Sequence, residues 1–357
     1  MSFKIGSRLE LSLFGESHGA AIGAVCCGFP AGEKIDFDAL KHFVSLRSPG
    51  KAYSSKRVEA DEFEILSGLN GDVTTGAPLC AVISNTDARP QDYKTDSFIP
   101  RPGHADFTAH IKWNGFADLT GGGHFSGRLT APLCVMGGIA LQMLKRRDVR
   151  VFAHVLMAGN IWDDRLPLIP DDDLLNVLDC PLPVINQDAK KAMLNAVKSI
   201  KDSSDSVGGI AECAVTGLEA GLGGYETQGV ESRLARALFA IPAVKGVEFG
   251  SGFDGARLLG SQNDDEFFIS DGSIKTRTNN CGGILGGITT GMPVTMCVAF
   301  KPTPTIGLPL NSVDILNKCA AVSQVSGRHD PCIVPRGVHA VKAVAALCAL
   351  DLLLEGI

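Results

Sequence analysis

Two histidines lie in short loops that glycine and proline shape. His18 lies in residues 14–19 (FGESHG), directly after a predicted strand, and His104 lies in residues 101–106 (RPGHAD). Histidine is the side chain best suited to proton transfer near neutral pH. A single histidine in such a loop is most often structural or simply exposed, but two of them favour a catalytic role. In the second loop, Asp106 is close enough in sequence to orient the imidazole of His104.

A glycine-rich turn at residues 121–130 (GGGHFSGRLT) runs into an apolar helical segment. Glycines at the start of a helix leave backbone N–H groups available to a phosphate. Arg128 would add a charge-assisted contact to the same anion. The turn matches neither a dinucleotide fingerprint nor a P-loop. It predicts phosphate binding, with an ordinary glycine-rich turn as the alternative.

Two further polar loops carry groups that suit anions. Residues 301–305 (KPTPT) combine one ammonium with two hydroxyls, and residues 327–331 (GRHDP) are followed by Arg336. The second loop lies between two apolar helical segments, where an unpaired charge is costly unless it has a ligand or a partner. Together the loops predict an enzyme that acts on a small anionic substrate.

The composition limits the classes of protein and of partner. The 357 residues are 45% hydrophobic and 20% charged, as in globular proteins, and the formal net charge of -6 argues against a nucleic-acid partner. A local cluster of Arg and His can still attract a small anion. Residues 1–16 lack the apolar core of a secretory signal, and the apolar stretch 338–354 is too short and too interrupted to span a membrane. Eleven cysteines without a CxxC pair indicate reduced thiols in a cytosolic protein, with no metal site.

Runs bounded by Gly, Pro, Asn or Asp predict strands at residues 22–27, 62–66, 79–84, 209–215 and 294–300. Helical spacing of apolar residues predicts helices at residues 37–46, 131–145, 188–201, 231–239, 312–322 and 338–354. The strands often come in pairs, which favours an α/β or α+β sandwich over a strictly alternating parallel sheet. The acidic stretch 163–183 is interpreted as a surface connection. A motif recurs as TTGAP at 74–78 and TTGMP at 289–293, each time before an apolar strand, which indicates either two related halves or a chance match.

In this order, the five polar loops resemble the chorismate synthase family from residues 14–19 to residues 327–331. Similar stretches lie between them, at residues 66–68 (LSG), 243–248 (AVKGVE), 260–262 (GSQ) and 282–287 (GGILGG). The resemblance implies an α+β fold in which two antiparallel sheets, built as two pseudo-related halves, are sandwiched between helices. It also implies a single domain over residues 1–357 and a homotetramer.

The resemblance further implies the reaction, a carbon–oxygen lyase step of the shikimate pathway in the cytoplasm. Phosphate is removed from 5-enolpyruvylshikimate 3-phosphate by anti 1,4-elimination to give chorismate, with reduced FMN and no net redox change. By resemblance, His104 protonates the leaving phosphate, His18 protonates the flavin, and Asp330 works with flavin nitrogen 5 to accept the substrate proton. Whether the chain reduces its flavin with NADPH or depends on an external source is left open.

The same resemblance assigns the binding residues. The substrate's phosphate and carboxylates are expected to meet Ser17, Arg47 and Arg128, since guanidinium forks suit such anions. The flavin is expected to meet His124, Phe125, Ser126, Ala243, Asn279, Gly286, Lys301, Pro302, Thr303, Pro304, Thr305 and Arg328.

This chain departs from the family pattern in two places. Many members have GGRSSARET where residues 122–130 are GGHFSGRLT, so the side chains at 124 and 125 differ from theirs. An arginine-rich segment is reduced to Arg47, and a family arginine is missing near Ala52, where Lys51, Lys56 or Arg57 could compensate. The thinned arginines leave open a flavin-binding relative without catalysis. A flavin oxidoreductase is disfavoured because no dinucleotide fingerprint is present.

Overall fold

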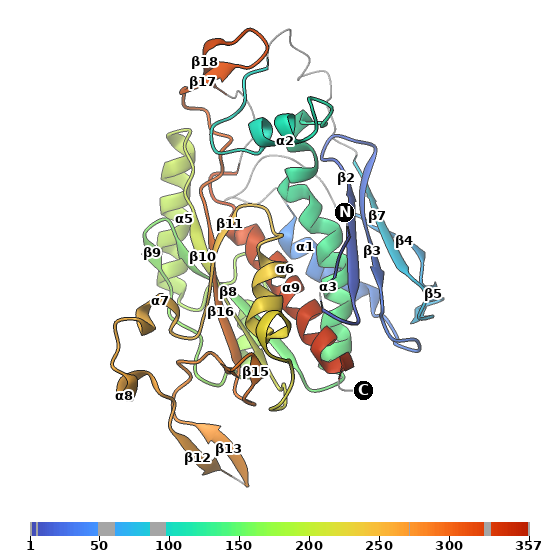
Figure 1. Ribbon diagram of the computed structural model, residues 1–357, viewed down its shortest axis with the longest axis vertical. Coiled ribbons are helices and arrows are strands. Elements are labelled where there is room, and N and C mark those ends of the chain that lie inside the picture. Colours follow the sequence, from blue (N-terminus) through green and yellow to red (C-terminus); the bar gives the residue numbers. More distant parts are fainter. Residues whose placement is uncertain are drawn as a thin grey trace.

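Two antiparallel sheets form the framework of the protein (Figure 1). The computed structural model describes residues 2–4, 6–48, 61–85, 98–270, 272–324 and 330–355. The first sheet has the strand order β1 (Ser2–Lys4), β2 (Glu10–Gly15), β3 (Ala21–Cys27), β7 (Leu79–Ser84) and β4 (Glu64–Ser67). The second has the order β11 (Val244–Phe249), β16 (Val294–Phe300), β10 (Gly209–Thr216), β8 (Arg150–Ala158) and β9 (Ile161–Trp162).

Helices and short hairpins complete the described part of the chain. The longer helices are α1 (Phe37–Arg47), α3 (Thr130–Lys145), α5 (Gln187–Asp202), α6 (Val230–Leu238) and α9 (Val334–Glu355). The shorter helices are α2 (Asp106–Lys112), η2 (Thr120–Phe125), η3 (Gly127–Leu129), α4 (Asp172–Leu178), η4 (Glu226–Gln228), α7 (Gly252–Gly255) and α8 (Gly260–Asn263). The hairpins are β5–β6 (Leu69–Asn70 and Val73–Thr74), β12–β13 (Phe267–Ser270 and Ser273–Thr276), β14–β15 (Ile284–Leu285 and Ile288–Thr289) and β17–β18 (Leu310–Asp314 and Cys319–Ser323).

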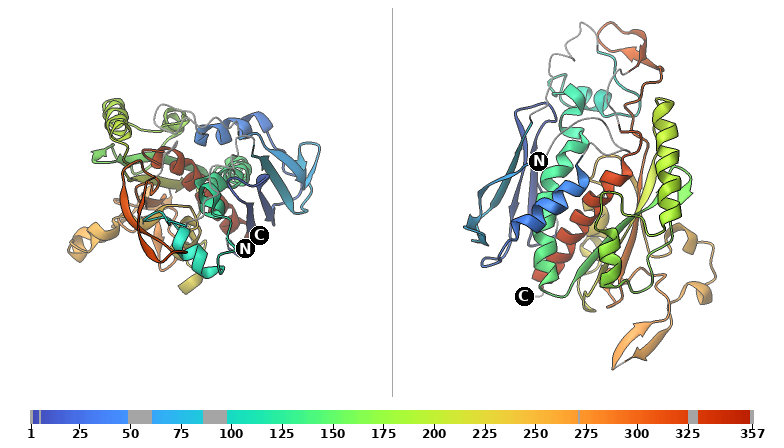
Figure 2. Two further views of the ribbon diagram at one scale, coloured as in Figure 1. Left: turned by 90° about the horizontal axis from the view of Figure 1, so that it is seen from above. Right: turned by 180° about the vertical axis from the view of Figure 1, so that it is seen from behind.

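Helices α1, α3 and α9 lie between the two sheets, and α5 covers the outer face of the second sheet (Figures 1 and 2). Thirteen of the 16 residues of α3 are buried, as expected for a helix that is apolar on all sides. The axes of α3 and α9 approach closely because Gly137 faces Ala343, where an added β-carbon would lie 2.3 Å from the alanine methyl group. The expected α+β class with two antiparallel sheets is confirmed. The central helices separate the two sheets, and the second sheet also has a helix, α5, on its outer face (Figures 1 and 2).

The repeated TTGxP motif has the same structure in both halves. Thr74 ends hairpin β5–β6 before β7, and Thr289 ends hairpin β14–β15 before β16. The Thr74 hydroxyl donates to the carbonyl of Pro30 at 2.6 Å, and the Thr289 hydroxyl donates to that of Glu219 at the same distance. Strands β7 and β16 then each pair with two neighbours in their own sheet. Both copies of the motif therefore have the same local structure and the same place before a central strand, as expected for two related halves.

The predicted helix at 312–322 is wrong, because this segment forms hairpin β17–β18. The carboxylate of Asp314 accepts the backbone N–H groups of Leu316 at 3.0 Å and Asn317 at 3.2 Å, and Lys318 then has a φ of 52°. An aspartate that bonds the backbone two and three residues onward closes a turn in competition with a helix.

A buried charged network anchors the connection that follows β8. Nδ1 of His154 lies 3.0 Å from Asp163, and its Nε2 lies 2.8 Å from Glu212 on β10. Burial alone would lower the pKa of His154, but the hydrogen bonds to Asp163 and Glu212 outweigh it and raise the pKa above its ordinary value. The stretch 163–183 is thus fixed to the sheet by a buried carboxylate at its start.

The carboxylate of Asp351 on α9 holds the segment before β2. It accepts the backbone N–H groups of Ser7, Arg8 and Leu9 at 3.1, 3.0 and 2.6 Å. Nη1 of Arg233 on α6 lies 3.5 Å from the same carboxylate. The first sheet, α6 and the last helix are therefore joined at one buried group.

Two described helical stretches are long and apolar enough to cross a membrane by length and composition alone, Gly127–Lys145 and Val334–Glu355. In each, 83% of the most apolar window is buried inside the protein, as in core helices. The prediction that residues 338–354 form a buried helix is confirmed.

Candidate active site

A triple-glycine turn brings the two histidine loops together. Gly121, Gly122 and Gly123 have φ values of 64°, 131° and 51°, which favour glycine. A β-carbon built on Gly121 would lie 1.9 Å from Cε1 of His18, and one on Gly122 would lie 3.5 Å from Nε2 of His104. Both imidazoles therefore border the same turn, and at position 121 a side chain would overlap His18.

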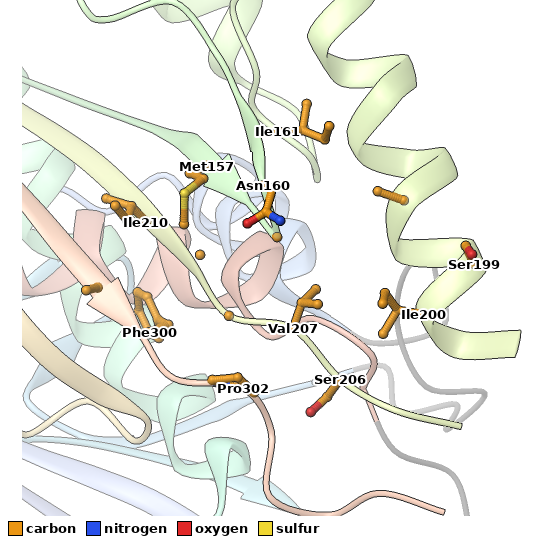
Figure 3. A pocket seen from close by; sticks show the side chains of 15 residues that line it. Met157, Asn160, Ile161, Ser199, Ile200, Ser206, Val207, Ile210, Phe300 and Pro302 are labelled. Carbon is orange, nitrogen blue, oxygen red and sulfur yellow. The ribbon is translucent and has the colours of Figure 1, made fainter. Parts of the chain in front are cut away.

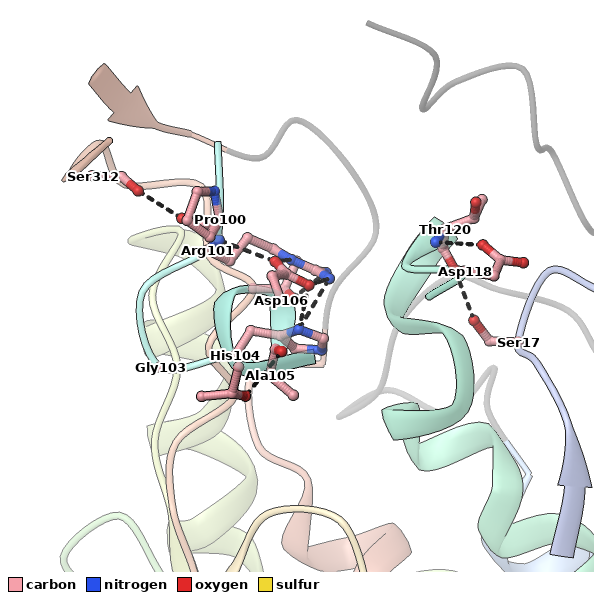
Figure 4. Close-up of polar contacts among 12 residues, drawn as sticks. Ser17, Pro100, Arg101, Gly103, His104, Ala105, Asp106, Asp118, Thr120 and Ser312 are labelled. Atoms are coloured by element: carbon pink, nitrogen blue, oxygen red, sulfur yellow. Dashed lines mark hydrogen bonds and ion pairs between the residues drawn. The ribbon is translucent and has the colours of Figure 1, made fainter. Parts of the chain in front are cut away.

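His104 is oriented by a carboxylate in its own loop (Figure 4). Oδ1 of Asp106 lies 2.6 Å from Nδ1 of His104, and Nε of Arg101 donates to Oδ2 at 2.7 Å. Burial alone would raise the pKa of Asp106, but hydrogen bonds from Arg101 and His104 outweigh it and hold the pKa well below its usual range. An ionised carboxylate only accepts, so the geometry assigns a proton to Nδ1 and directs Nε2 toward Gly122. With a second proton on Nε2, His104 is arranged as a general acid.

His18 is held by the buried hydroxyl of Ser17. That hydroxyl donates to the carbonyl of Thr120 at 3.2 Å (Figure 4). It also lies 3.0 Å from Nδ1 of His18. Since the single hydroxyl proton goes to Thr120, Ser17 accepts from Nδ1 of His18. The predicted substrate residue Ser17 thus fixes the tautomer of the predicted catalytic residue His18.

The loop 301–305 packs against the loop of His104. Nζ of Lys301 donates to the carbonyl of Gly103, and Nη1 of Arg101 donates to the Thr305 hydroxyl at 3.2 Å. Burial, together with the positive charge of Lys245, lowers the pKa of Lys301. The Lys301 backbone N–H donates to the carbonyl of Ala243 at 3.0 Å, so Ala243 and residues 301–305 form one surface beside His104.

The two predicted substrate arginines are neighbours, and one carboxylate bridges them. Nη1 of Arg47 lies 3.0 Å from Oδ2 of Asp61, and Nη1 of Arg128 contacts Oδ1. The Ser48 hydroxyl donates to Oδ2 at 2.7 Å. On the far side of Arg128, Nε donates to the side-chain oxygen of Asn85 at 3.2 Å. All three charged side chains are at most 3% exposed.

Asp330 adjoins this arginine pair through a third arginine. Nη1 of Arg336 lies 2.5 Å from Oδ2 of Asp330, and Nε of Arg336 donates to the backbone carbonyl of Arg47 at 3.1 Å. The predicted base, Asp330, is therefore linked to Arg47 through one intervening residue, Arg336.

The three residues after the triple glycine have different surroundings. The His124 ring is exposed, with Nδ1 3.1 Å from the carbonyl of Gly15, and the Phe125 ring lies 5.8 Å from the ring of Trp113. The Ser126 hydroxyl accepts the backbone N–H of Arg128 at 3.2 Å and so caps the short helix that presents this arginine.

Two predicted flavin residues are not brought to this site within one chain. The side-chain amide of Asn279 donates to the carbonyl of Pro293, just before β16, and Gly286 lies in the turn of β14–β15. Lys301 directly follows the other end of β16, whose seven residues span roughly 20 Å at about 3.3 Å each (Figure 1). Arg328, Lys51, Ala52, Lys56 and Arg57 lie outside the described residues.

Asp61 and Asn85 belong to the site but were not predicted from the sequence. The side-chain amide of Asn85 donates to the carbonyls of Glu16 and Gly19, both at 2.9 Å, so it links the His18 loop to Arg128. Asp61 directly precedes the predicted strand 62–66, and Asn85 directly follows the predicted strand 79–84. A polar residue at the end of a strand was the sequence feature that could have indicated their role.

A hollow of about 640 Å³ lies between α5 and the second sheet and reaches Pro302 of the loop 301–305 (Figure 3). Its lining includes Met157, Ile161, Ile200, Val207 and Phe300, and none of its lining residues is ionisable. It therefore lacks the groups needed to move a proton or to balance an anion.

Comparison with known proteins agrees with this geometry. The family model described as chorismate synthase matches residues 9–354. Curated chorismate synthases of Lancefieldella parvula, Korarchaeum cryptofilum and Dehalococcoides mccartyi (strain ATCC BAA-2266) are 40%, 41% and 42% identical to this chain. These alignments cover 97–99% of this chain and 96–97% of each relative. A crystal structure of chorismate synthase has a TM-score of 0.75 at 27% identity and covers 98% of this chain and 93% of its own. The chain therefore belongs to the chorismate synthase family of lyases.

Proposed function

We propose that this chain removes phosphate from 5-enolpyruvylshikimate 3-phosphate by anti 1,4-elimination, giving chorismate with reduced FMN as cofactor. The main observation in support of the proposal is that His18 and His104 both border the same triple-glycine turn. Arg128 follows that turn closely and lies beside Arg47, so proton donors and guanidinium groups come from one region. A phosphorylated dicarboxylate needs both kinds of group.

The residues present fit a cofactor that carries a phosphate. Lys301 and Arg101 supply positive charge beside Ala243, and the hydroxyl oxygen of Thr303 is buried with no hydrogen-bond partner among the described residues. Residues 301–305, Ala243 and Ser126 would hold the flavin. When bound, the reduced flavin supplies electron density that assists carbon–oxygen cleavage and is recovered unchanged.

The chain's own side chains then divide the proton transfers. His104, kept in one tautomer by Asp106, donates a proton from Nε2 to the departing phosphate. Arg128 binds and orients an anionic group of the substrate, and Asp330 accepts the proton that leaves carbon 6. His18, fixed by Ser17, holds a proton next to the cofactor.

We further propose that the protein is a cytoplasmic homotetramer. Hairpin β12–β13 projects from the body of the protein (Figure 1) and exposes 64% of Phe267, 78% of Ile269 and 69% of Ile274. Exposed apolar groups of this kind support association with other copies. Sedimentation equilibrium of the purified protein would give the mass of the assembly.

An anaerobic assay with purified protein, chemically reduced FMN and the phosphorylated substrate tests the activity. The expected result is chorismate and phosphate in equal amounts, with no net oxidation of the flavin. Net flavin oxidation in step with turnover would instead identify an oxidoreductase. A second arm with oxidised FMN and NADPH asks whether the chain reduces its own flavin.

The variant His104→Ala separates an active enzyme from a flavin-binding relative without catalysis. It should bind FMN normally and turn over about 100- to 10,000-fold more slowly, the usual contribution of a general acid. A wild-type protein that folds and binds FMN but forms no product would contradict the proposed function.

A further inference from the structure

Asp61 occupies the position between Arg47 and Arg128 that an anionic ligand would take. Each carboxylate oxygen meets the Nη1 group of a different arginine, at 3.0 Å for Arg47 and at hydrogen-bond contact for Arg128. The Ser48 hydroxyl adds a third donor at 2.7 Å. This bridging arrangement of one carboxylate and two guanidinium groups is how arginine pairs bind phosphate and carboxylate ligands.

The arginine cluster retains capacity for another anion. Nε and Nη2 of Arg47 are buried, and neither has a hydrogen-bond partner among the residues that the structure describes. Buried donors of this kind are costly unless a ligand meets them. Arg47, Arg128 and Arg336 face two carboxylates, Asp61 and Asp330, so these five side chains carry one net positive charge.

The backbone holds Asp61 in this position at a cost. Its φ is 50°, in the left-handed region that residues other than glycine rarely adopt. Burial alone would raise the pKa of Asp61, but the charges of Arg47 and Arg128 outweigh it and keep the pKa below its usual range. The carboxylate is therefore ionised near neutral pH, with its charge fixed between the two arginines.

We infer that Asp61 is an internal counter-ion that holds Arg47 and Arg128 in place before an anion binds and competes with the substrate's anionic group for their N–H donors. An anion that takes the two Nη1 groups must displace the carboxylate. The competition weakens anion binding, which favours release of a phosphate product. That the anion belongs to the substrate rests on the proposed function, whereas the counter-ion role rests on the geometry.

The test compares Asp61→Asn with the wild-type protein, using inorganic phosphate as the probe. Asparagine keeps the shape of the side chain but removes the competing charge. Calorimetric titration should show phosphate binding roughly 5- to 100-fold more tightly, the range expected from one charge at a few ångströms. The melting temperature of the variant should fall in phosphate-free buffer and recover with added phosphate. Unchanged or weaker phosphate binding in a folded variant would overturn the inference.

Asp351→Asn is the matched control, because it removes another buried carboxylate that lies beside an arginine. It should also lose thermal stability, but without a gain in phosphate affinity or a recovery in phosphate. An equal gain in this control would mean that net charge alone explains the effect, and would overturn the inference. Repeating the titration with saturating FMN separates the two sources of phosphate. A gain that persists assigns the anion to the substrate, and a gain that FMN abolishes overturns that assignment.

If Asp61→Asn does not fold, the variant Ser48→Ala tests the counter-ion role instead. It removes one donor to Asp61 and leaves both charges, so it should release Asp61 more readily and tighten phosphate binding about twofold or more. A wild-type phosphate affinity in Ser48→Ala would then overturn the inference. Neither readout requires turnover, so failure of the proposed function and failure of the counter-ion role are distinguishable.

Discussion

Oδ1 of Asp106 lies 2.6 Å from Nδ1 of His104, two residues earlier in the chain. This contact leaves the other ring nitrogen directed at the triple-glycine turn, where His18 also lies. The orientation of the general acid thus depends on the carboxylate that holds its other ring nitrogen.

Asp106→Asn should therefore slow turnover about 10- to 1,000-fold while leaving FMN binding intact. The amide cannot balance a protonated imidazole, and it can present its NH₂ group to Nδ1 and favour the wrong tautomer. Steady-state kcat measured beside the FMN dissociation constant checks this. Thr108→Ala, an exposed change in the first turn of α2, is the control, and its kcat and FMN dissociation constant should be close to those of the wild type. A folded Asp106→Asn variant with wild-type kcat would remove Asp106 from the orientation of His104.

Gly121→Ala should displace His18 and abolish most turnover. The added methyl group would lie 1.9 Å from the ring, and the residue has a φ of 64°. Gly71→Ala shares the conformational penalty, with a φ of 62°, but meets no atom within 4 Å. Both should lose about 1–2 kcal/mol of stability, and only Gly121→Ala should lose activity. Equal activities in the two variants would show that His18 tolerates displacement.

His154→Gln should destabilise the protein in a pH-dependent way. The raised pKa of His154 means that its contribution is complete below the unfolded value of about 6.5 and is lost as pH rises through the folded value. The lowered pKa values of Asp163 and Glu212 keep both carboxylates charged at pH 6. The free energy of unfolding should fall by about 3–5 kcal/mol near pH 6, and the gap to wild type should narrow toward pH 9.

Denaturant titrations at several pH values measure that gap. His42→Gln is the control, since His42 and Asp179 form an ion pair in which each side chain is 53% exposed. Exposed pairs of this kind contribute about 0–1 kcal/mol. A gap for His154→Gln that stays constant from pH 6 to 9 would show that the histidine is not charged in the folded protein.

Asp330→Asn should give a folded protein that binds FMN and substrate but turns over slowly. The amide can still accept from Arg336, but it cannot take up a proton. Cleavage of the C–H bond should become more rate-limiting, so deuterium at carbon 6 should produce a larger isotope effect than in the wild type. Wild-type speed, or poor folding, would make Asp330 a structural partner of Arg336.

The sequence predicted the elements whose burial follows a simple pattern. The expected helix at 131–145 corresponds to α3 (Thr130–Lys145), and the strand at 294–300 matches β16. Strand β8 was not predicted because it is buried on both faces, so its residues do not alternate between apolar and polar. The helix expected at 312–322 failed because the backbone hydrogen bonds of Asp314 favour a turn.

The candidate site was predictable where the interacting side chains are close together in the sequence. The loop 101–106 holds an acid, its orienting carboxylate and an arginine within six residues. The pairing of Arg47 with Arg128 through Asp61 was not predictable, because Asp61 is 14 residues from one arginine and 67 from the other. These side chains are brought together by the packing of α1 on α3 and of β2 and β3 on the turns that precede α3.

The anchoring of residues 7–9 by Asp351 has a consequence for how the protein is made. Leu9 and Asp351 are 342 residues apart, and at about 5–20 residues per second the ribosome needs about 17–70 s to synthesise what lies between them. Until then the segment before β2 lacks this anchor, whereas α3, which packs on β3 and β7, is complete by residue 145. The N-terminal end of the first sheet is therefore fixed only when synthesis of the chain is almost complete, although the helix that packs on this sheet is available much earlier.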